Sequence, residues 1–492
     1  MTGTRTSSAV ELFVPLHRED ERPLHHQLEQ QLRDAVRNGR LGPVTTLPSS
    51  RALASQLGIA RGVVVEAYEQ LVAEGYLLAR PGGSTRVASV PTQPTRAPSL
   101  EGAVGLELDF RPGRPDLAEF PRLTWSRSLR RVLVEAPAER LSYLDGRGVP
   151  ELRDVLSGYL DRVRGTCTNP ADIVISNGFA QGLQLVARAL RESGARRVGV
   201  EDPWNSVHRK MLTASGLEVV PVPVDGEGIQ VQRLELAHVD AVVVTPAHQY
   251  PTGAVLSAER RSALIEWADG HDTLIIEDDY DAEFRYDREP IGAMQGLCAD
   301  RVAYAGTASK TLAPGLRLGW LAVPRRLTDR IARAKVAADF GSGALDQLAL
   351  ADFIDRGELD RHLRRMRSIY RLRRDALLAG LEQHLPDIRP AGASAGLHVL
   401  AWLPAGVDEA TLVNEAAEQS IGLQGVTPTF ADGHETGGII FGYAAIDEGR
   451  ISLGLERLSS LRAWRGRIGQ PSRAARAGQS ETARQVSRQD AR

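Results

Sequence analysis

The sequence predicts two domains of different fold class: an N-terminal α+β module of short helices with a hairpin, and a longer C-terminal α/β domain. Helical spacing followed by a hairpin pattern occupies residues 15–88, and a segment without hydrophobic period follows at 89–105. From 106 to 465, short apolar runs end in acidic clusters or glycine turns, as expected of buried parallel strands followed by helices. At 492 residues, the chain is also longer than one ordinary core supports.

The composition is that of a globular protein in water. Hydrophobic residues make up 42% of the chain, charged residues make up 25%, and the formal net charge is -2. Cys167 and Cys298 form neither a metal-ligand spacing nor a disulfide framework, so we expect a reducing compartment and no metal site. No apolar run reaches membrane-spanning length, and the N-terminus lacks the apolar core of a signal peptide, which favours the cytoplasm.

The N-terminal module begins with a predicted helix at 23–37, where apolar residues recur every fourth position. A short helix is expected within 47–58, because Ser49 or Ser50 can cap its start and Gly58 can end it. The apolar stripe of the first helix consists of Leu24, Leu28, Leu32 and Val36.

Residues 59–75 predict a further helix, although consecutive valines weaken its helical propensity. Two short helices joined by a tight turn form a helix-turn-helix, and residues 76–88 predict a hairpin that turns at 81–84 and supplies a wing. In such a module the second helix enters the major groove of DNA, while flanking cations hold phosphates. A small protein-interaction domain is the alternative. The cations best placed to contact DNA are Arg51, Arg61 and Arg86.

Two segments carry no packing pattern. The segment 89–105 contains several prolines and predicts a semi-extended linker. The Arg-rich segment 466–492 predicts a disordered tail, which is either inert or in nonspecific contact with DNA.

Lys310 is one of only three lysines in a chain rich in arginine. An arginine keeps its proton in a protein, whereas a lysine can attack an aldehyde once its pKa is lowered. Nearby, Thr307 and Ser309 offer hydroxyl donors and Arg317 offers a bidentate grip on phosphate oxygens. Together these residues indicate a pyridoxal 5′-phosphate (PLP) site in which Lys310 forms a Schiff base with the cofactor. A solvated surface lysine is the alternative.

An acidic cluster ends the apolar run at 273–281. A carboxylate at the carboxyl end of a buried strand can hold the pyridine nitrogen of PLP protonated. We assign this role to Asp278, and to Tyr280 a hydrogen bond to the phenolic oxygen of the cofactor. Asp279 is the alternative carboxylate, because a one-residue slip in strand phase would exchange the two. A solvated strand end without a cofactor is the remaining alternative.

A strand, a glycine turn and a helix are predicted within 172–190. Free backbone amides at the start of such a helix bind anions readily. The candidates to hold the PLP phosphate are Gly178, Phe179 and Ala180.

Two segments resemble known families. The pattern Ser-Lys-x-x-x-Pro-Gly-x-Arg-x-Gly at 309–319 resembles the lysine segment of fold-type I PLP-dependent enzymes of the aminotransferase class I and II group. The pattern Leu-Pro-Ser-Ser-Arg-x-Leu-Ala-x-x-Leu-Gly at 47–58, with Ala-Tyr-x-x-Leu-x-Ala-Glu-Gly-Tyr at 67–76, resembles the winged helix of GntR-family repressors. Their combination resembles the MocR subfamily of bacterial regulators over residues 15 to 460.

The resemblance implies a homodimer in which PLP, sometimes with an amino compound, changes how the DNA-binding domains sit. It implies that Tyr143 reaches the phosphate of the cofactor bound by the other subunit. It also implies an aromatic side chain stacked on the pyridine ring. Trp204 is the candidate, although Asn205 occupies the more usual aromatic position.

Two departures from the family patterns affect function. Ala60 stands where GntR-type domains usually have a serine or threonine that caps the recognition helix. Ile440 stands where aminotransferases of this fold carry the arginine that binds the substrate carboxylate. Because an aliphatic side chain cannot pair with a carboxylate, ordinary transamination of α-amino acids is not expected unless another arginine substitutes.

The leading hypothesis is a PLP-binding transcriptional regulator whose aminotransferase-like domain senses PLP itself or an amino compound. The alternative is an active PLP-dependent aminotransferase with a fused DNA-binding domain, which needs a carboxylate anchor. A third possibility, a DNA-binding protein with a vestigial cofactor site, conflicts with the intact set of Lys310, Asp278 and Arg317.

Overall fold

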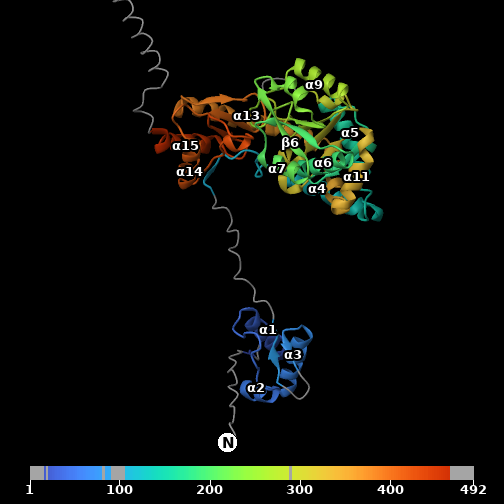
Figure 1. The fold of residues 1–492 in the computed structure, drawn as a ribbon, viewed down its shortest axis with the longest axis vertical. Helices are drawn as coiled ribbons and strands as arrows, with labels where there is room; N and C mark the ends of the chain where they lie inside the picture. The colour runs from blue at the N-terminus through green and yellow to red at the C-terminus, as the bar shows by residue number, and fades with distance from the viewer. Residues whose placement is uncertain are drawn as a thin grey trace, which may run out of the picture. The chain divides into compact units, whose positions relative to one another are not determined.

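The structure, a computed structural model, describes residues 16–17, 20, 22–79, 84–89, 106–286 and 291–465. These residues form two units, one on each side of residues 90–105 (Figure 1). The turn expected at 81–84 falls mostly outside the described residues, as do nearly all of the predicted linker and the whole predicted tail. No described helix is both long and apolar enough to cross a membrane.

The N-terminal unit confirms the winged helix-turn-helix. The stripe residues Leu28, Leu32 and Val36 are buried with Val64 and Leu71 in one apolar core, whereas Leu24 is half-buried. Its elements are α1 (Leu24–Arg37), α2 (Ser50–Leu57), α3 (Arg61–Ala73), β1 (Leu77–Leu78) and β2 (Arg86–Val87).

The predicted caps of the short helix form as expected. The hydroxyl of Ser49 accepts a hydrogen bond from the amide of Ala52 at 3.2 Å, and Gly58 ends α2 with a φ of 63°. By contrast, Ala60 precedes α3 and offers no side-chain cap. The recognition helix therefore begins with its first amides uncapped by a side chain.

The C-terminal unit is built around a mixed sheet with the strand order β4-β11-β10-β9-β8-β5-β6-β7 among the described residues. Neighbouring strands from β10 through β6 are parallel, and β11 runs antiparallel to both of its neighbours. The strands are β4 (Ile173–Ser176), β5 (Arg197–Asp202), β6 (Glu218–Asp225), β7 (Gly228–Ile229), β8 (Ala241–Val244), β9 (Leu274–Asp279), β10 (Val302–Thr307) and β11 (Gly319–Ala322).

Helices cover both faces of this sheet, because alternate strand residues enter different apolar cores. On β4, Ile173 and Ile175 pack with residues of α5 and α12, whereas Val174 packs with residues of α6 and α11. The helices of this part are α4 (Arg122–Glu135), α5 (Pro150–Arg164), α6 (Phe179–Glu192), α7 (Ser206–Ala214), α8 (Val231–Ala237), α9 (Ala258–Gly270), α10 (Ala308–Thr311), α11 (Arg325–Asp339) and α12 (Ala344–Asp355).

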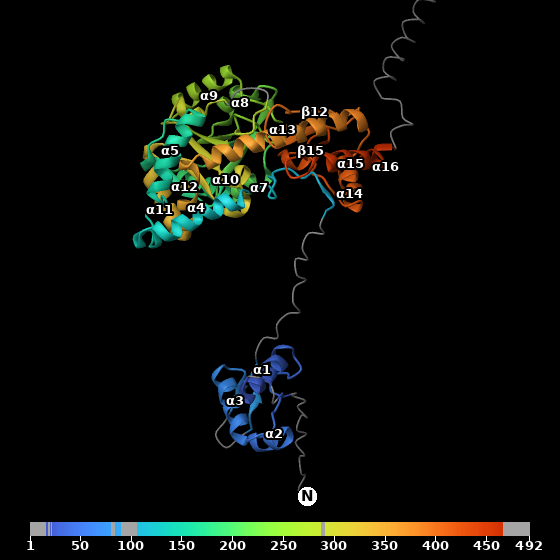
Figure 2. The ribbon, with the colours of Figure 1, turned by 180° about the vertical axis from the view of Figure 1, so that it is seen from behind.

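The long helix α13 (Glu358–His384) connects the sheet to a smaller part of the same unit, most of which appears in orange and red in Figures 1 and 2. An antiparallel sheet of order β12-β13-β15 and a short parallel pair of β3 with β14 belong to this part. Its elements are β3 (Leu108–Asp109), β12 (Arg389–Ala391), β13 (His398–Trp402), α14 (Glu409–Glu418), β14 (Ile421–Gly422), β15 (Gly438–Gly442), α15 (Glu448–Ser459) and α16 (Arg462–Arg465).

Short 3₁₀ helices complete the described elements. They are η1 (Ala138–Leu141), η2 (Pro170–Asp172), η3 (Met294–Gly296), η4 (Pro314–Leu316) and η5 (Thr427–Thr429). The sheet order brings the carboxyl ends of β9 and β10 side by side, which is where ligands bind in sheets of this kind.

Candidate functional site

A cavity of about 570 Å³ opens at the carboxyl ends of the parallel strands. Residues from the ends of β9 and β10 form its floor, and residues from β13 and the loop after β14 reach it from the smaller part. Most of the predicted cofactor residues meet here. Its wall includes Phe179, Ala180, Trp204, Asp278, Tyr280, Thr307, Ser309, Lys310 and Arg317.

Lys310 lies in α10, directly after β10, with its amine inside the cavity. The Nζ donates a hydrogen bond to the carbonyl oxygen of Gly113 at 2.6 Å. Burial lowers the pKa of Lys310, while the carboxyl groups of Asp281 and Asp278 act in the opposite direction. A lowered pKa leaves more of the amine neutral at a given pH, as a nucleophile requires.

The adjacent acids Asp278 and Asp279 point to opposite faces of β9. Asp279 forms a buried ion pair with Arg164, at 2.7 and 2.9 Å, and accepts a hydrogen bond from Tyr304 at 2.7 Å. Asp278 faces the cavity, where its Oδ1 is buried and has no hydrogen-bond partner among the described residues. Burial raises the pKa of Asp278 well above its ordinary value, and Asp279 and Asp281 raise it further.

A buried carboxyl group without a partner is costly, which makes Asp278 a ready acceptor for a cationic or proton-bearing ligand atom. The same argument removes Asp279 from consideration, because its oxygens already bind Arg164 and Tyr304. Of the two acids left open by the sequence, Asp278 is the one that can meet a ligand in the cavity.

Tyr280 lies on the cavity wall and is held from behind by a buried polar network. Its hydroxyl donates to the carbonyl oxygen of His248 at 3.1 Å. The Nδ1 of His248 lies 3.1 Å from a carboxylate oxygen of Asp281. Burial lowers the pKa of His248, but the Asp281 carboxylate outweighs burial, so the pKa is raised overall. This network fixes the direction of the Tyr280 phenol.

The start of α6 and the side chain of Arg317 meet at one end of the cavity. Gly178 precedes α6 with a φ of 82°, and a Cβ at this position would lie 3.1 Å from the Arg317 guanidinium. The hydroxyl oxygens of Thr307 and Ser309 lie 3.0 Å apart beside them. A guanidinium, two hydroxyl groups and the free amides of a helix start form a site suited to an anion.

Trp204 is almost completely buried and contributes an aromatic surface to the cavity. Asn205 instead caps α7, because its side-chain oxygen accepts from the amides of Val207 and His208. The His208 ring centroid lies 5.7 Å from that of Trp204 and 5.0 Å from that of Phe179. Burial and the Lys310 ammonium lower the pKa of His208 to about 4, so this imidazole is neutral near pH 7.

Several wall residues have no counterpart in the sequence-based site, and four of them, including His208, carry a polar side chain of particular interest. Gln424 donates a hydrogen bond to the Tyr250 hydroxyl at 2.8 Å, and both side chains face the cavity with His398. Gln424 comes from the loop after β14 and follows no recognisable local motif, so only the tertiary fold could have revealed it. The four residues are His208, Tyr250, His398 and Gln424.

Ile440 is fully buried in β15, where it packs with Leu400 and Val426 and does not reach the cavity wall. Among the described residues of the wall, Lys310 and Arg317 are the only lysine or arginine side chains. The wall therefore offers no further arginine that could replace the missing carboxylate anchor.

Tyr143 lies outside the cavity of its own chain. Its side chain is 86% exposed, and its ring centroid lies 6.1 Å from that of Phe340, which is also exposed. Within a single chain, Tyr143 is therefore not part of the cavity that contains Arg317.

The three predicted DNA-contacting arginines are all exposed. Arg51 belongs to α2, and Arg61 is the first residue of α3, where its Nε donates to the Ser50 hydroxyl at 3.3 Å. Arg86 belongs to β2 and lies opposite Leu78 in the wing. The Arg61–Ser50 contact joins the two helices at the end of α3 that would enter the major groove.

Two family models match the chain. The model described as "Bacterial regulatory proteins, gntR family" matches residues 24–87, and "Aminotransferase class I and II" matches residues 119–421. Among solved structures, an archaeal alanine:glyoxylate aminotransferase is 28% identical with a TM-score of 0.66, covering 72% of this chain and 90% of its own. A Pyrococcus horikoshii kynurenine aminotransferase is 26% identical with a TM-score of 0.68, covering 74% and 92%.

Curated relatives match both units together. The probable rhizopine catabolism regulatory protein MocR of Rhizobium meliloti is 32% identical, covering 91% of this chain and 95% of its own length. The pyridoxine biosynthesis transcriptional regulator PdxR of Corynebacterium glutamicum is 31% identical, covering 91% and 98%. The uncharacterized transcriptional regulator YhdI of Bacillus subtilis is 33% identical, covering 91% and 97%.

Proposed function

The chain belongs to the MocR subfamily of GntR-type transcriptional regulators, and on this premise we propose that its aminotransferase-like unit holds PLP and acts as the sensor that controls DNA binding. The observation that carries the proposal is a buried amine, Lys310, in the same cavity as the unpartnered carboxyl of Asp278. An aldehyde with a basic ring nitrogen satisfies both groups.

The cavity residues fit each part of PLP. Lys310 would hold the aldehyde carbon covalently, with loss of water, and Asp278 would hold the proton of the pyridine nitrogen. Tyr280 would donate to the phenolic oxygen in place of its present hydrogen bond to the His248 carbonyl. Bound PLP supplies an electron-poor ring and an electrophilic carbon that primary amines attack. Trp204 would pack on the ring. The phosphate would be held by Arg317, Thr307, Ser309 and the first amides of α6, which are those of Phe179 and Ala180 after the close-packed Gly178.

The effector is either PLP itself or an amino compound that competes with Lys310 for the cofactor. PdxR is named for pyridoxine biosynthesis, which favours PLP as one class of effector. The protein is expected to have one domain arrangement that binds DNA and one that does not. Either ligand shifts the equilibrium between them only by the difference in its affinity for the two arrangements.

Sensing is favoured over turnover because the cavity lacks a carboxylate anchor. Ile440 packs into an apolar cluster, and Arg317, the only arginine among the described wall residues, is committed to the phosphate. An α-amino acid would therefore bind without an ion pair for its carboxylate, which weakens the binding needed for efficient transamination.

The sensor acts as a homodimer. Large apolar side chains are exposed on α4 and η1 and directly after η1 and α11, which supports a surface that another subunit covers. In the dimer, the Tyr143 hydroxyl of one subunit binds the phosphate held by the other, so each site needs both subunits. The exposed residues are Leu123, Leu133, Val134, Leu141, Tyr143 and Phe340.

Footprinting tests the proposal as a whole. The full chain is incubated with the DNA upstream of its own coding sequence, with and without PLP and with a panel of primary amines. We expect a protected region whose affinity or extent changes with PLP or with one amine. Protection that is identical under all of these conditions would contradict the sensor function.

A further inference from the structure

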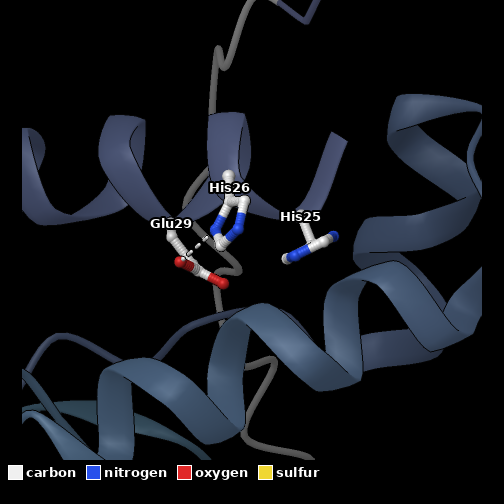
Figure 3. Close-up of side chains that lie close together, drawn as sticks. All are labelled: His25, His26 and Glu29. Carbon is white, nitrogen blue, oxygen red and sulfur yellow. Dashed lines mark hydrogen bonds and ion pairs between the residues drawn. The ribbon is translucent and has the colours of Figure 1, made fainter. Parts of the chain in front are cut away.

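The N-terminal unit contains a cluster of histidine and carboxylate side chains that does not belong to its apolar core and includes none of the arginines predicted to contact DNA. His25, His26 and Glu29 lie on one side of α1, and one potential ligand atom from each lies within 4.8 Å of the other two (Figure 3). Glu66 of α3 approaches the His25 member of this group, with its Oε1 3.7 Å from the Nε2 of His25.

The spacing along α1 explains why these side chains converge. His25 and Glu29 are four residues apart and His26 and Glu29 are three apart, which are the separations that place side chains next to one another on a helix. The Nδ1 of His26 lies 3.2 Å from a Glu29 carboxylate oxygen. Two ligands of a tetrahedral metal ion, each about 2.0–2.2 Å from the ion, are separated by about 3.3–3.5 Å. The His26–Glu29 pair already has nearly this separation.

The charges of the cluster favour a divalent cation. The Glu29 side chain is only 7% exposed, and among the ion pairs of the described residues its partner is His26. A buried carboxylate of this kind needs compensation. Glu29 and Glu66 bring two carboxyl groups to the cluster, and a divalent ion there adds positive charge to that of the Arg33 guanidinium, which also interacts electrostatically with Glu29. The exposed fractions of 60% for His26 and 63% for Glu66 leave the cluster open to an ion from solvent.

We propose that His25, His26, Glu29 and Glu66 form a binding site for a divalent transition-metal ion of the Zn²⁺ type, which links α1 to the recognition helix α3. Two imidazole nitrogens and two carboxylate oxygens suit Zn²⁺, Co²⁺ or Ni²⁺, whereas Mg²⁺ and Ca²⁺ prefer oxygen ligands alone. This contradicts the expectation from the sequence, which considered cysteine spacing and found no metal site.

A metal ion at this position would stabilise α3, whose first turn is weakly stabilised by its own sequence. The first turn of α3 has no side-chain cap and includes Gly62 and consecutive valines. An ion that binds only the folded arrangement stabilises that arrangement by mass action. Metal binding at this site would therefore change the affinity for DNA independently of the PLP cavity.

The test uses the full chain without an affinity tag, stripped with a chelator and titrated with Zn²⁺ alone by calorimetry. His26→Asn and Glu66→Gln remove proposed ligands at exposed positions, where we expect little effect on folding, and Glu29→Gln keeps side-chain size while removing the charge. The matched control is His271→Asn, which breaks an exposed histidine–glutamate contact with Glu235 at 3.3 Å in the other unit. Circular dichroism checks that each variant is folded.

We expect one Zn²⁺ per chain to bind at this site, and each ligand variant to weaken that step at least ~10-fold while the control leaves it unchanged. Hydrogen exchange of α1 and α3 should slow on Zn²⁺ addition in the wild type and in the control, but not in the ligand variants. Isotherms that coincide for the wild type and His26→Asn/Glu66→Gln, or exchange in α1 and α3 that ignores Zn²⁺, would overturn the proposal. PLP uptake, measured in parallel, should be the same in all variants.

Discussion

At the scale of single residues, the structure distinguishes side chains that the sequence made nearly equivalent. Asp278 and Asp279 are neighbours of the same type, yet one faces a cavity without a partner and the other holds the buried cation Arg164. Strand phase decides between them, and strand phase is a property of the sheet. A local motif could therefore propose both acids but could not choose.

This distinction predicts opposite results for two matched substitutions. Asp279→Asn leaves Arg164 buried without its counter-charge and should lower the free energy of unfolding by about 3–5 kcal/mol. Asp278→Asn removes a carboxyl that no described residue pairs with, so stability should change little while PLP affinity falls at least ~10-fold. Urea unfolding and PLP titration measure the two effects. Equal effects of both substitutions on PLP affinity would contradict the assignment.

The lowered pKa of His208 leads us to predict that the free energy of unfolding depends on pH. Its pKa in the folded state is about 4, below the ordinary value of 6.5. Between these values the unfolded chain binds a proton that the folded chain does not, so stability falls as the pH decreases from 6.5 towards 4. The loss from this group is at most about 3 kcal/mol.

The His208 effect can be isolated by unfolding the wild type and His208→Gln at pH 7 and at pH 4.5. All six tryptophans lie after residue 124, so tryptophan fluorescence reports the C-terminal unit alone. The variant should lose less stability than the wild type on acidification. An equal loss in both proteins would show that His208 is not the responsible group.

At the scale of elements, local patterns predicted the helices of the N-terminal unit well because their signals are local. The Ser49 cap, the Gly58 end and the four-residue apolar spacing each act within one helix. Some wall residues of the cavity could also be predicted from the sequence, because they directly follow a strand, as Lys310 follows β10. The position of Gln424 in the cavity wall could not be predicted, because Gln424 reaches the cavity from a loop far along the chain. A pattern cannot report a contact that only the fold creates.

The uncapped start of α3 leads to a further prediction. Ala60 has extended backbone angles, φ −65° and ψ 139°, which suit a capping residue. Ala60→Ser should therefore stabilise the helix by about 1 kcal/mol, which corresponds to roughly fivefold slower exchange of α3 amides that open locally. Hydrogen exchange with mass spectrometry on the full chain measures this effect. Ala52→Ser, at an exposed position inside α2, is the control and should give no protection of α3.

At the scale of the whole molecule, the chain joins a DNA-binding module to a unit with an aminotransferase fold. The described residues form two units, one before and one after residues 90–105 in the sequence, and each has its own apolar core. DNA binding and PLP binding should therefore be separable by substitution.

Arg61→Ala tests this separation. Arg61 is exposed at the start of α3, and its side chain forms a hydrogen bond with Ser50 among the described residues, so its removal should not unfold the module. Loss of a base or phosphate contact should weaken DNA binding by about 1–3 kcal/mol, or roughly 5- to 150-fold. Fluorescence anisotropy with the footprinted DNA measures the change. PLP uptake should remain at the wild-type level, and its simultaneous loss would indicate misfolding instead.

The most direct test of the account is whether Lys310 carries PLP. The full chain is mixed with PLP, its near-visible absorbance is recorded, and the product is reduced with borohydride and mapped by peptide mass spectrometry. Lys210 is exposed on α7 and serves as the internal comparison. We expect a new absorbance band and a pyridoxyl mass on the peptide containing Lys310, both lost in Lys310→Ala and unchanged in Lys210→Ala. No band and no mass at Lys310 with PLP in excess would contradict the account.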